Sequence, residues 1–196
     1  MRHGEPAESK YKHFLGQADP ELSSLGKTQA EELARAFEKK SIEVNALYSS
    51  DLARAVQTAL PLKKKFNCEL KQLKDLREIN IGQWEGMSFE EVKKKFPKEF
   101  EERGRDLANF RPPEGESFAD LKKRAWPAFK KIVVEEKGNI VIVAHAGVNR
   151  VVLSHLLGKS LQDMFEIRQN HAHVNIIENI GDKWKVIEIN KSLTEV

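Results

Sequence analysis

Four basic side chains in the sequence have the chemistry to act on phosphorus. Arg2 and His3 open the chain, Arg54 follows one predicted strand, and His145 directly follows another. A guanidinium presents a planar fork of N–H donors that matches phosphate oxygens and stays charged. A histidine can attack phosphorus with its free ring nitrogen. Two arginines and two histidines that converge on one point therefore predict phosphoryl transfer.

A carboxyl group is also needed, because a leaving alkoxide requires a proton. The same group could later activate the water that cleaves a phosphoenzyme. Glu78 and Glu85 both lie in the polar segment 76–86. The residue types alone leave these two as alternatives, and either could instead cap a helix or pair with a lysine.

Strand and helix patterns alternate along the chain and would position these groups. The strands are expected at 44–48, 69–73 and 139–144, the helices at 24–40, 51–66, 88–97, 117–137 and 147–158, and a terminal hairpin at 174–189. This alternation predicts an α/β fold, a three-layer α/β/α sandwich with a mostly parallel central sheet. Ligands bind beyond the carboxyl ends of such strands, where Arg54 and His145 would share one rim. We expect Asp51 to cap the second helix.

Length and composition limit the class of protein. With 196 residues, 40% apolar and 32% charged, a single domain over residues 1–196 is expected. The net charge of +3 is dispersed, so we expect no nucleic-acid partner. No apolar stretch is long enough to span a membrane, so we expect no membrane partner. The single cysteine, Cys68, excludes a disulfide framework and favours a reducing, cytoplasmic location.

A pair of histidines, His171 and His173, stands near the end of the chain. On a strand this spacing puts both rings on one face, where they could bind a metal. No cysteine or third ligand stands nearby, so we expect no metal and no cofactor. One of the rings is instead expected to line the pocket mouth, and the pair is expected to help select the substrate.

The segment Arg2-His3-Gly4-Glu5 resembles the RHG signature of the histidine phosphatase superfamily, also called phosphoglycerate mutase-like. RHG alone is a weak signal, but five further segments match the family in order and make the combination specific. They are residues 16–30, 49–59, 76–86, 115–117 and 145–150. The resemblance covers nearly the whole chain and implies a phosphoglycerate mutase-like fold.

The resemblance implies a role for each matched residue. His3 would be the phosphorylated nucleophile, and Glu78, favoured over Glu85, would be the proton donor. The phosphate pocket would consist of Arg2, Arg54 and His145.

Two further positions, Gln17 and Ala146, match those that contact the substrate in the family. The chain also departs from the family pattern. Pro6 and Ser9 stand where Ser or Thr and Asn are usual. A proline lacks both a hydroxyl and a backbone donor, so we do not expect this position to supply the secondary phosphate contact of the family.

The resemblance implies a phosphomonoester hydrolase that acts on a small phosphorylated metabolite through phosphohistidine, without metal. It is closest to the alpha-ribazole phosphatase and broad-specificity branch. One alternative is phosphoglycerate mutase-type phosphoryl transfer. We expect a helical cap insertion at about 87–113, and its short segment of mixed lysines and glutamates favours hydrolysis. A second alternative is a catalytically weak module that binds a phosphorylated ligand. The sequence does not define the oligomeric state.

Only Met1 precedes Arg2 in the sequence. In the family, a strand of about five to seven residues leads into the RHG segment, which is an ordinary strand length. We therefore expect either that the chain extends upstream or that this supporting strand is absent and the fold is weakened.

Overall fold

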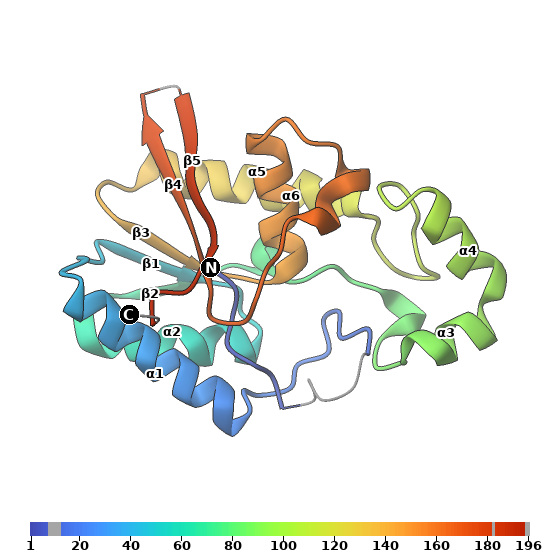
Figure 1. Cartoon of the computed structure of the whole chain (residues 1–196), viewed down its shortest axis with the longest axis horizontal. Coiled ribbons are helices and arrows are strands. Elements are labelled where there is room, and N and C mark those ends of the chain that lie inside the picture. The colour runs from blue at the N-terminus through green and yellow to red at the C-terminus, as the bar shows by residue number, and fades with distance from the viewer. Residues whose placement is uncertain (8–12, 182, 195–196) are drawn as a thin grey trace.

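A parallel sheet lies at the centre of the molecule (Figure 1). The structure is a computed structural model that describes residues 1–7, 13–181 and 183–194, so Ser9 lies outside the described residues. The sheet consists of β1 (Ala46–Ser49), β2 (Leu70–Gln72) and β3 (Ile140–Val143) in the order β2-β1-β3. Both neighbouring pairs are parallel, as the sequence predicts.

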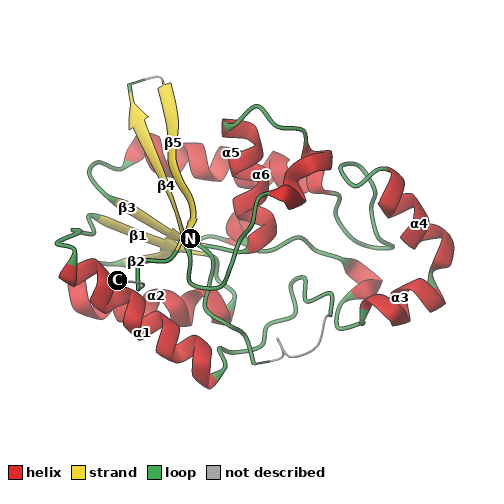
Figure 2. Ribbon diagram, viewed as in Figure 1, coloured by secondary structure: helices red, strands yellow, loops and turns green. Residues whose placement is uncertain are grey.

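Helices α1 (Ser24–Lys39) and α2 (Ala53–Phe66) cover one face of this sheet (Figure 2). Successive strand residues point to opposite faces, so alternate positions of β1 and β3 pack against these helices. In the apolar core between the sheet and these two helices, β1 contributes Leu47, and β3 contributes Val141 and Val143. Ser23 begins α1, because its hydroxyl accepts a hydrogen bond from the Gly26 amide at 3.0 Å.

Helices α5 (Phe118–Glu135) and α6 (Ala146–Leu156) pack against the other face. The intervening positions of the same strands join this second core, with Ala46 and Tyr48 buried in it. A capping box at Ser117 begins α5, because the hydroxyl and the backbone amide of this residue both bond within the first turn. These two helix layers around a mostly parallel sheet confirm the predicted three-layer fold.

Residues 1–3 add a short parallel pairing beside β3. The Ala144 amide donates to the Met1 carbonyl, and the His3 amide donates to the Ala144 carbonyl, both at 3.0 Å. Strands β4 (Val174–Ile180) and β5 (Lys183–Lys191) then form an antiparallel hairpin, which confirms the predicted terminal hairpin. His3 therefore lies between the carboxyl end of β3 and the segment that leads into β4.

Two short helices, α3 (Phe89–Lys95) and α4 (Pro97–Arg105), lie at the opposite end of the molecule from the hairpin (Figure 1). A capping box between Ser88 and Glu91 begins α3, close to the start of the helix expected at 88–97. Helix α4 was not predicted, because Pro97 indicates the end of a helix. Here Pro97 also starts the next helix, at the position that tolerates a missing N–H. Short 3-10 turns occur at Lys74–Leu76, Gly82–Trp84 and Leu161–Glu166.

The prediction that Asp51 caps α2 is wrong. Its carboxylate instead accepts two hydrogen bonds from the Arg77 guanidinium, each 2.7 Å long. A bidentate charged pair is stronger than a single bond to a backbone amide. The amide of Ala53 is bound by the carboxylate of Asp19 at 2.7 Å, so a distant loop provides the cap.

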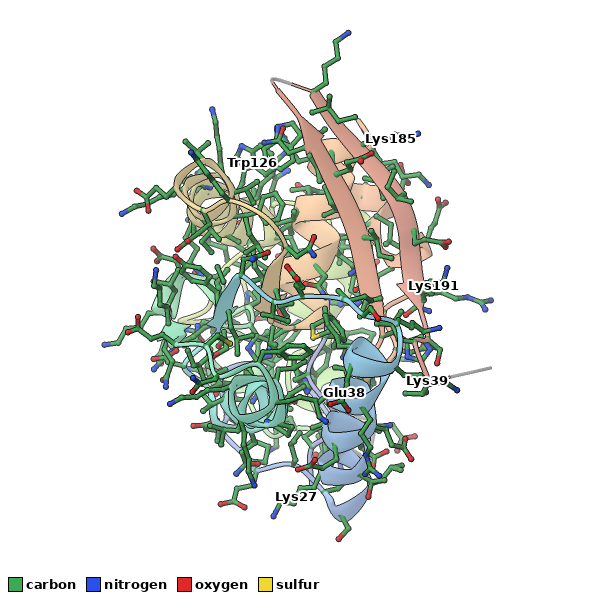
Figure 3. All side chains as sticks on the ribbon, turned by 90° about the vertical axis from the view of Figure 1, so that its left-hand side faces the viewer. Lys27, Glu38, Lys39, Trp126, Lys185 and Lys191 are labelled. Atoms are coloured by element: carbon green, nitrogen blue, oxygen red, sulfur yellow. The ribbon has the colours of Figure 1, made fainter. Side chains whose placement is uncertain are left out.

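The outer surfaces of α1 and of the hairpin carry charged side chains. Lys27, Glu38 and Lys39 on α1, and Lys185 and Lys191 on β5, are exposed and extend away from the core (Figure 3). Within the described residues, no helix has the length and apolar character to cross a bilayer.

Candidate active site

The segment that carries His3 is fixed by backbone hydrogen bonds on both sides. Besides its amide bond to Ala144, the His3 carbonyl accepts from the Ala172 amide at 3.1 Å. The next amide, of Gly4, donates to the hydroxyl of Thr58 on α2 at 2.9 Å. The His3 ring is thus anchored by three elements and is 3% exposed.

The glycine of the RHG signature is required by the close approach of α1. A Cβ on Gly4 would lie 2.7 Å from the carbonyl oxygen of Gly26, and a Cβ on Gly26 would lie 2.1 Å from the carbonyl oxygen of Glu5. Both distances are too short for any side chain. The RHG segment and the matched segment 16–30 therefore each supply one glycine to the same close backbone contact.

The His3 ring has a defined tautomer. Its Nδ1 lies 2.6 Å from the Gly4 carbonyl, which can only accept, so Nδ1 carries the proton. The Nε2 lone pair is then free. Burial, together with the nearby charges of His145 and Arg2, holds the pKa of His3 well below its ordinary value. The ring is therefore neutral near pH 7 and available as a nucleophile.

His145 lies beside this ring, with the two ring centroids 5.0 Å apart. It is fully buried at the start of α6, and within the described residues neither of its ring nitrogens has a hydrogen-bond partner. Burial and the charges of Arg54 and Arg2 hold its pKa well below the ordinary value. Such unsatisfied buried nitrogens favour a ligand that could bond to them.

Arg2 and Arg54 are both tied to backbone carbonyls while part of each guanidinium stays available. Arg2 donates to the Gln169 carbonyl at 2.6 Å, and Arg54 donates to Ala18 at 2.6 Å and to Gly16 at 2.9 Å. Burial lowers the pKa of Arg2 to about 10 and also lowers that of Arg54. Both remain cations at neutral pH, so this end of the site is strongly positive.

The Glu78 carboxylate faces this positive site and lines the same pocket. It accepts hydrogen bonds from the amides of Ile79 at 2.9 Å and Gly147 at 3.0 Å. A Cβ on Gly147 would lie 2.2 Å from Glu78 Oε1, so only glycine permits this approach. Gly147 thus positions the Glu78 carboxylate.

Arg124 on α5 holds the backbone that carries Glu78. Its guanidinium donates to the carbonyls of Asp75 at 2.9 Å, Arg77 at 2.8 Å and Glu78 at 2.9 Å. It also pairs with both oxygens of Glu116 at 2.8 Å. Burial favours the neutral form of Glu116, but Arg124 outweighs this and lowers its pKa. Arg124 is therefore a positioning residue, which the sequence analysis missed because it lies on an ordinary helix surface pattern.

The two expected substrate contacts differ in their placement. Ala146 lines the pocket. The side-chain amide of Gln17 donates to the Glu78 carbonyl at 3.1 Å, and the Gln17 backbone amide donates to Glu85 at 2.8 Å. Gln17 and Glu85 thus support the loop around Glu78, while Glu78 itself points into the pocket.

The pocket has a volume of about 240 Å³ and contains Arg2, His3, Arg54 and Glu78. Much of its wall is apolar. The aromatic side chains in that wall, apart from histidine, are Phe14, Trp84, Phe89, Phe110, Phe118 and Phe165. A phosphoryl group at the basic end would leave the rest of its ligand against aromatic surface.

Helix α4 contributes one cation to this pocket, Arg103, which the sequence analysis did not single out. Its Cζ lies 5.5 Å from the ring centroid of Phe14 and 5.9 Å from that of Phe165. The Cζ of Arg150 on α6 also lies near Phe165, 4.7 Å from its ring centroid. These distances are typical of cation–π contacts. The spacing of residues in the sequence does not predict these contacts of Arg103 and Arg150, because they join segments far apart in the chain.

The comparison with protein families establishes the class. The model of the histidine phosphatase superfamily (branch 1) matches residues 1–192. The chain belongs to this superfamily, which confirms the resemblance seen in its motifs.

Similar curated proteins include several forms of 6-phosphofructo-2-kinase/fructose-2,6-bisphosphatase. The 6-phosphofructo-2-kinase/fructose-2,6-bisphosphatase of Gallus gallus is 32% identical over 167 residues, which are 85% of this chain and 34% of that protein. Form 4 of Homo sapiens is 33% identical over 163 residues, 83% of this chain and 33% of that protein. The chain thus spans about a third of the length of these relatives.

Similar solved structures share the fold over nearly the whole chain. Bacillus stearothermophilus YhfR has a TM-score of 0.89 and 29% identity, covering 99% of this chain and 96% of that one. A mycobacterial glucosyl-3-phosphoglycerate phosphatase in complex with VO3 has a TM-score of 0.86 and 27% identity, with 97% and 96% covered. The alpha-ribazole phosphatase of Shigella flexneri has a TM-score of 0.89 at 21% identity, with 97% and 94% covered, and so shares the fold.

Proposed function

We propose that the chain hydrolyses a phosphomonoester through a phosphohistidine on His3. The observation that carries this proposal is the His3 ring. Its Nδ1 proton is committed to the Gly4 carbonyl, and its neutral Nε2 is left free beside His145 and two arginines. A neutral ring nitrogen in a positive site is suited to attack phosphorus in a dianionic ester.

In the first step, His3 Nε2 forms a bond to phosphorus while the ester P–O bond breaks. The leaving oxygen takes a proton from Glu78. In the second step a water attacks the phosphohistidine, Glu78 takes the proton of that water, and the P–N bond breaks to release inorganic phosphate. Arg2, Arg54 and His145 hold the phosphoryl oxygens and stabilise their charge through both steps.

The aromatic wall supports a substrate whose organic part is largely apolar or planar. Broad-specificity and alpha-ribazole-type phosphomonoesters belong to this class, and we propose that the substrate is a small metabolite of this kind. We also propose that no metal takes part, since Arg2 and Arg54 supply the cationic groups. Rates that are unchanged by EDTA would support this part of the proposal.

The direct test is rapid quench with a radiolabelled aryl phosphate. We expect an acid-labile, base-stable phosphoenzyme in the wild type and none in His3→Ala, with turnover reduced at least 10³-fold, since removal of a nucleophile removes the covalent route. Full activity of His3→Ala would refute the proposal. Phosphate binding by the wild type without phosphoenzyme would instead identify the chain as a binding module.

One observation favours phosphoglycerate mutase-type transfer as a second candidate. Transfer within a phosphorylated acid requires a second cationic contact, and Arg103 brings a guanidinium to the far part of the pocket. A coupled assay of phosphoglycerate interconversion decides between the two. Interconversion faster than phosphate release would favour transfer over hydrolysis.

A further inference from the structure

The turn formed by residues 171–173 is joined to the nucleophile segment. The Ala172 amide donates to the His3 carbonyl at 3.1 Å, and the Arg2 amide donates to the His173 carbonyl at 3.1 Å. The His173 ring Nδ1 lies 3.0 Å from the His171 carbonyl. The turn is therefore held against the segment that carries the nucleophile.

Ala172 adopts an unusual backbone conformation in this turn. Its φ of 56° lies in the left-handed region, which a residue with a Cβ adopts only at a cost. Such a conformation persists where surrounding contacts fix it, and it is often found at functional sites. Here it brings the His171 ring to a centroid distance of 5.5 Å from the His3 ring.

The His171 ring has a buried nitrogen without a protein partner. Its Nε2 is inaccessible to solvent and has no hydrogen bond within the described residues. Burial first, and then the charges of Arg2 and Arg54, lower the pKa of His171 to about 3. The ring is therefore neutral, and among the described residues its Nε2 finds no hydrogen-bond partner.

The charged and titratable groups around His171 come from three places. Arg2 and His3 belong to the N-terminal segment, Arg54 belongs to α2, and His173 shares the turn. All of these groups are basic. A dianionic phosphoryl group on this side of the site would reverse the local balance of charge and favour a proton on His171.

We propose that His171 is a third histidine of the phosphoryl site, which takes up a proton when a tetrahedral dianion binds and donates from Nε2 to one of its oxygens. The proposal rests on the proposed function and adds a binding residue to that same site. The proton comes from solvent, so binding of the dianion is coupled to proton uptake. Because the pKa of His171 is higher in the bound state than in the free state, affinity rises as the pH falls.

The test is calorimetric binding of sulfate, which remains a dianion from pH 5.5 to 8.5. Two buffers with different heats of ionisation give the number of protons taken up per sulfate. We expect His171→Gln to take up fewer protons than the wild type and to bind sulfate about tenfold more weakly at pH 5.5, the effect of one charged hydrogen bond. The affinities should converge at pH 8.5.

The matched control is His173→Asn, which changes the other ring of the same turn and keeps a donor for the His171 carbonyl. It should bind sulfate and take up protons as the wild type does. Equal proton uptake and equal affinity in His171→Gln and the wild type would overturn the proposal.

Two further measurements separate the possible failures. The ¹⁵N shift of the His171 ring in the wild-type protein must move toward the protonated value when sulfate is added at pH 6, which tests the proposal without any substitution. An unchanged shift overturns it. Failure of the proposed function would appear separately, as full hydrolysis by His3→Ala, because sulfate binding requires no chemistry.

Discussion

Gly147 is the position at which a single methyl group should disable the proton donor. In Gly147→Ala the new Cβ would lie 2.2 Å from Glu78 Oε1, whereas ordinary contact begins near 3.4 Å. The carboxylate must therefore move by about 1 Å and weaken its 3.0 Å bond to the Gly147 amide. A misplacement of about 1 Å costs roughly 10²-fold in rate, which corresponds to about 2.7 kcal/mol.

The assay compares two substrates with different leaving groups. An alkyl phosphate needs a proton on its leaving oxygen, whereas p-nitrophenolate leaves readily as an anion. We expect kcat/KM of Gly147→Ala to fall about 100-fold for the alkyl ester and less than tenfold for the aryl ester. This ratio is meaningful because kcat/KM reports the step that forms the phosphoenzyme.

The control is Gly104→Ala on α4, where a Cβ would meet no atom within 4 Å. It should keep the wild-type kcat/KM for both esters and gain up to about 1 kcal/mol of stability from helix propensity. Equal losses for the two esters in Gly147→Ala would refute the role of Glu78 as proton donor. Full activity would refute the steric argument itself.

Two other outcomes test the electrostatics of the site. Arg124→Met should lower the free energy of unfolding by about 2–4 kcal/mol in urea titrations, because it leaves the half-buried Glu116 carboxylate without its cation. Adding Glu116→Gln to this variant should recover part of the loss. If the free-energy changes of the two single variants simply add in the double variant, the pairing is contradicted. The pKa values of His3 and His145 lie below their ordinary 6.5 in the folded state, so their contribution to stability is full above pH 6.5 and is lost as the pH falls. Thermal unfolding from pH 8 to 5 should show a loss approaching 1.4 kcal/mol per pH unit for each ring, and His145→Asn should flatten the curve; the same slope in this variant would show that its ring is not buried in the neutral form.

Local signals in the sequence predicted much of the fold. The capping boxes at Ser88 and Ser117 are formed by residues three apart, so they can be read without any knowledge of tertiary structure. The apolar run 140–143 likewise indicates a strand covered on both faces. The start of α2 was predicted incorrectly, because its cap comes from Asp19, a residue 34 positions away.

The same reasoning applies to the candidate site. His3, Arg54, Glu78 and His145 were chosen from motifs, and the structure brings them to one region. Arg103 could not be found in this way, because its environment is made by Phe14 and Phe165, which no spacing rule connects to it. Contacts of this kind depend on how distant segments pack.

The hydrogen bonds that Arg124 makes to Glu116 and to the backbone around Glu78 also have a consequence for how the substrate range could change. Across the two stems of the α3–α4 segment, the Glu116 amide donates to the Asn80 carbonyl and the Asn80 amide donates to the Glu116 carboxylate. Beside them, the Gln83 amide donates to the Pro113 carbonyl. Hydrogen bonds thus hold the two stems together on the side of Glu78, while residues 87–113 contribute to the distal wall of the pocket. Residues 87–113 can therefore be replaced as a unit without changing the stems. Grafting a foreign insert between fixed stems should retune selectivity while the hydrolytic machinery stays intact, which offers a route for both divergence and engineering.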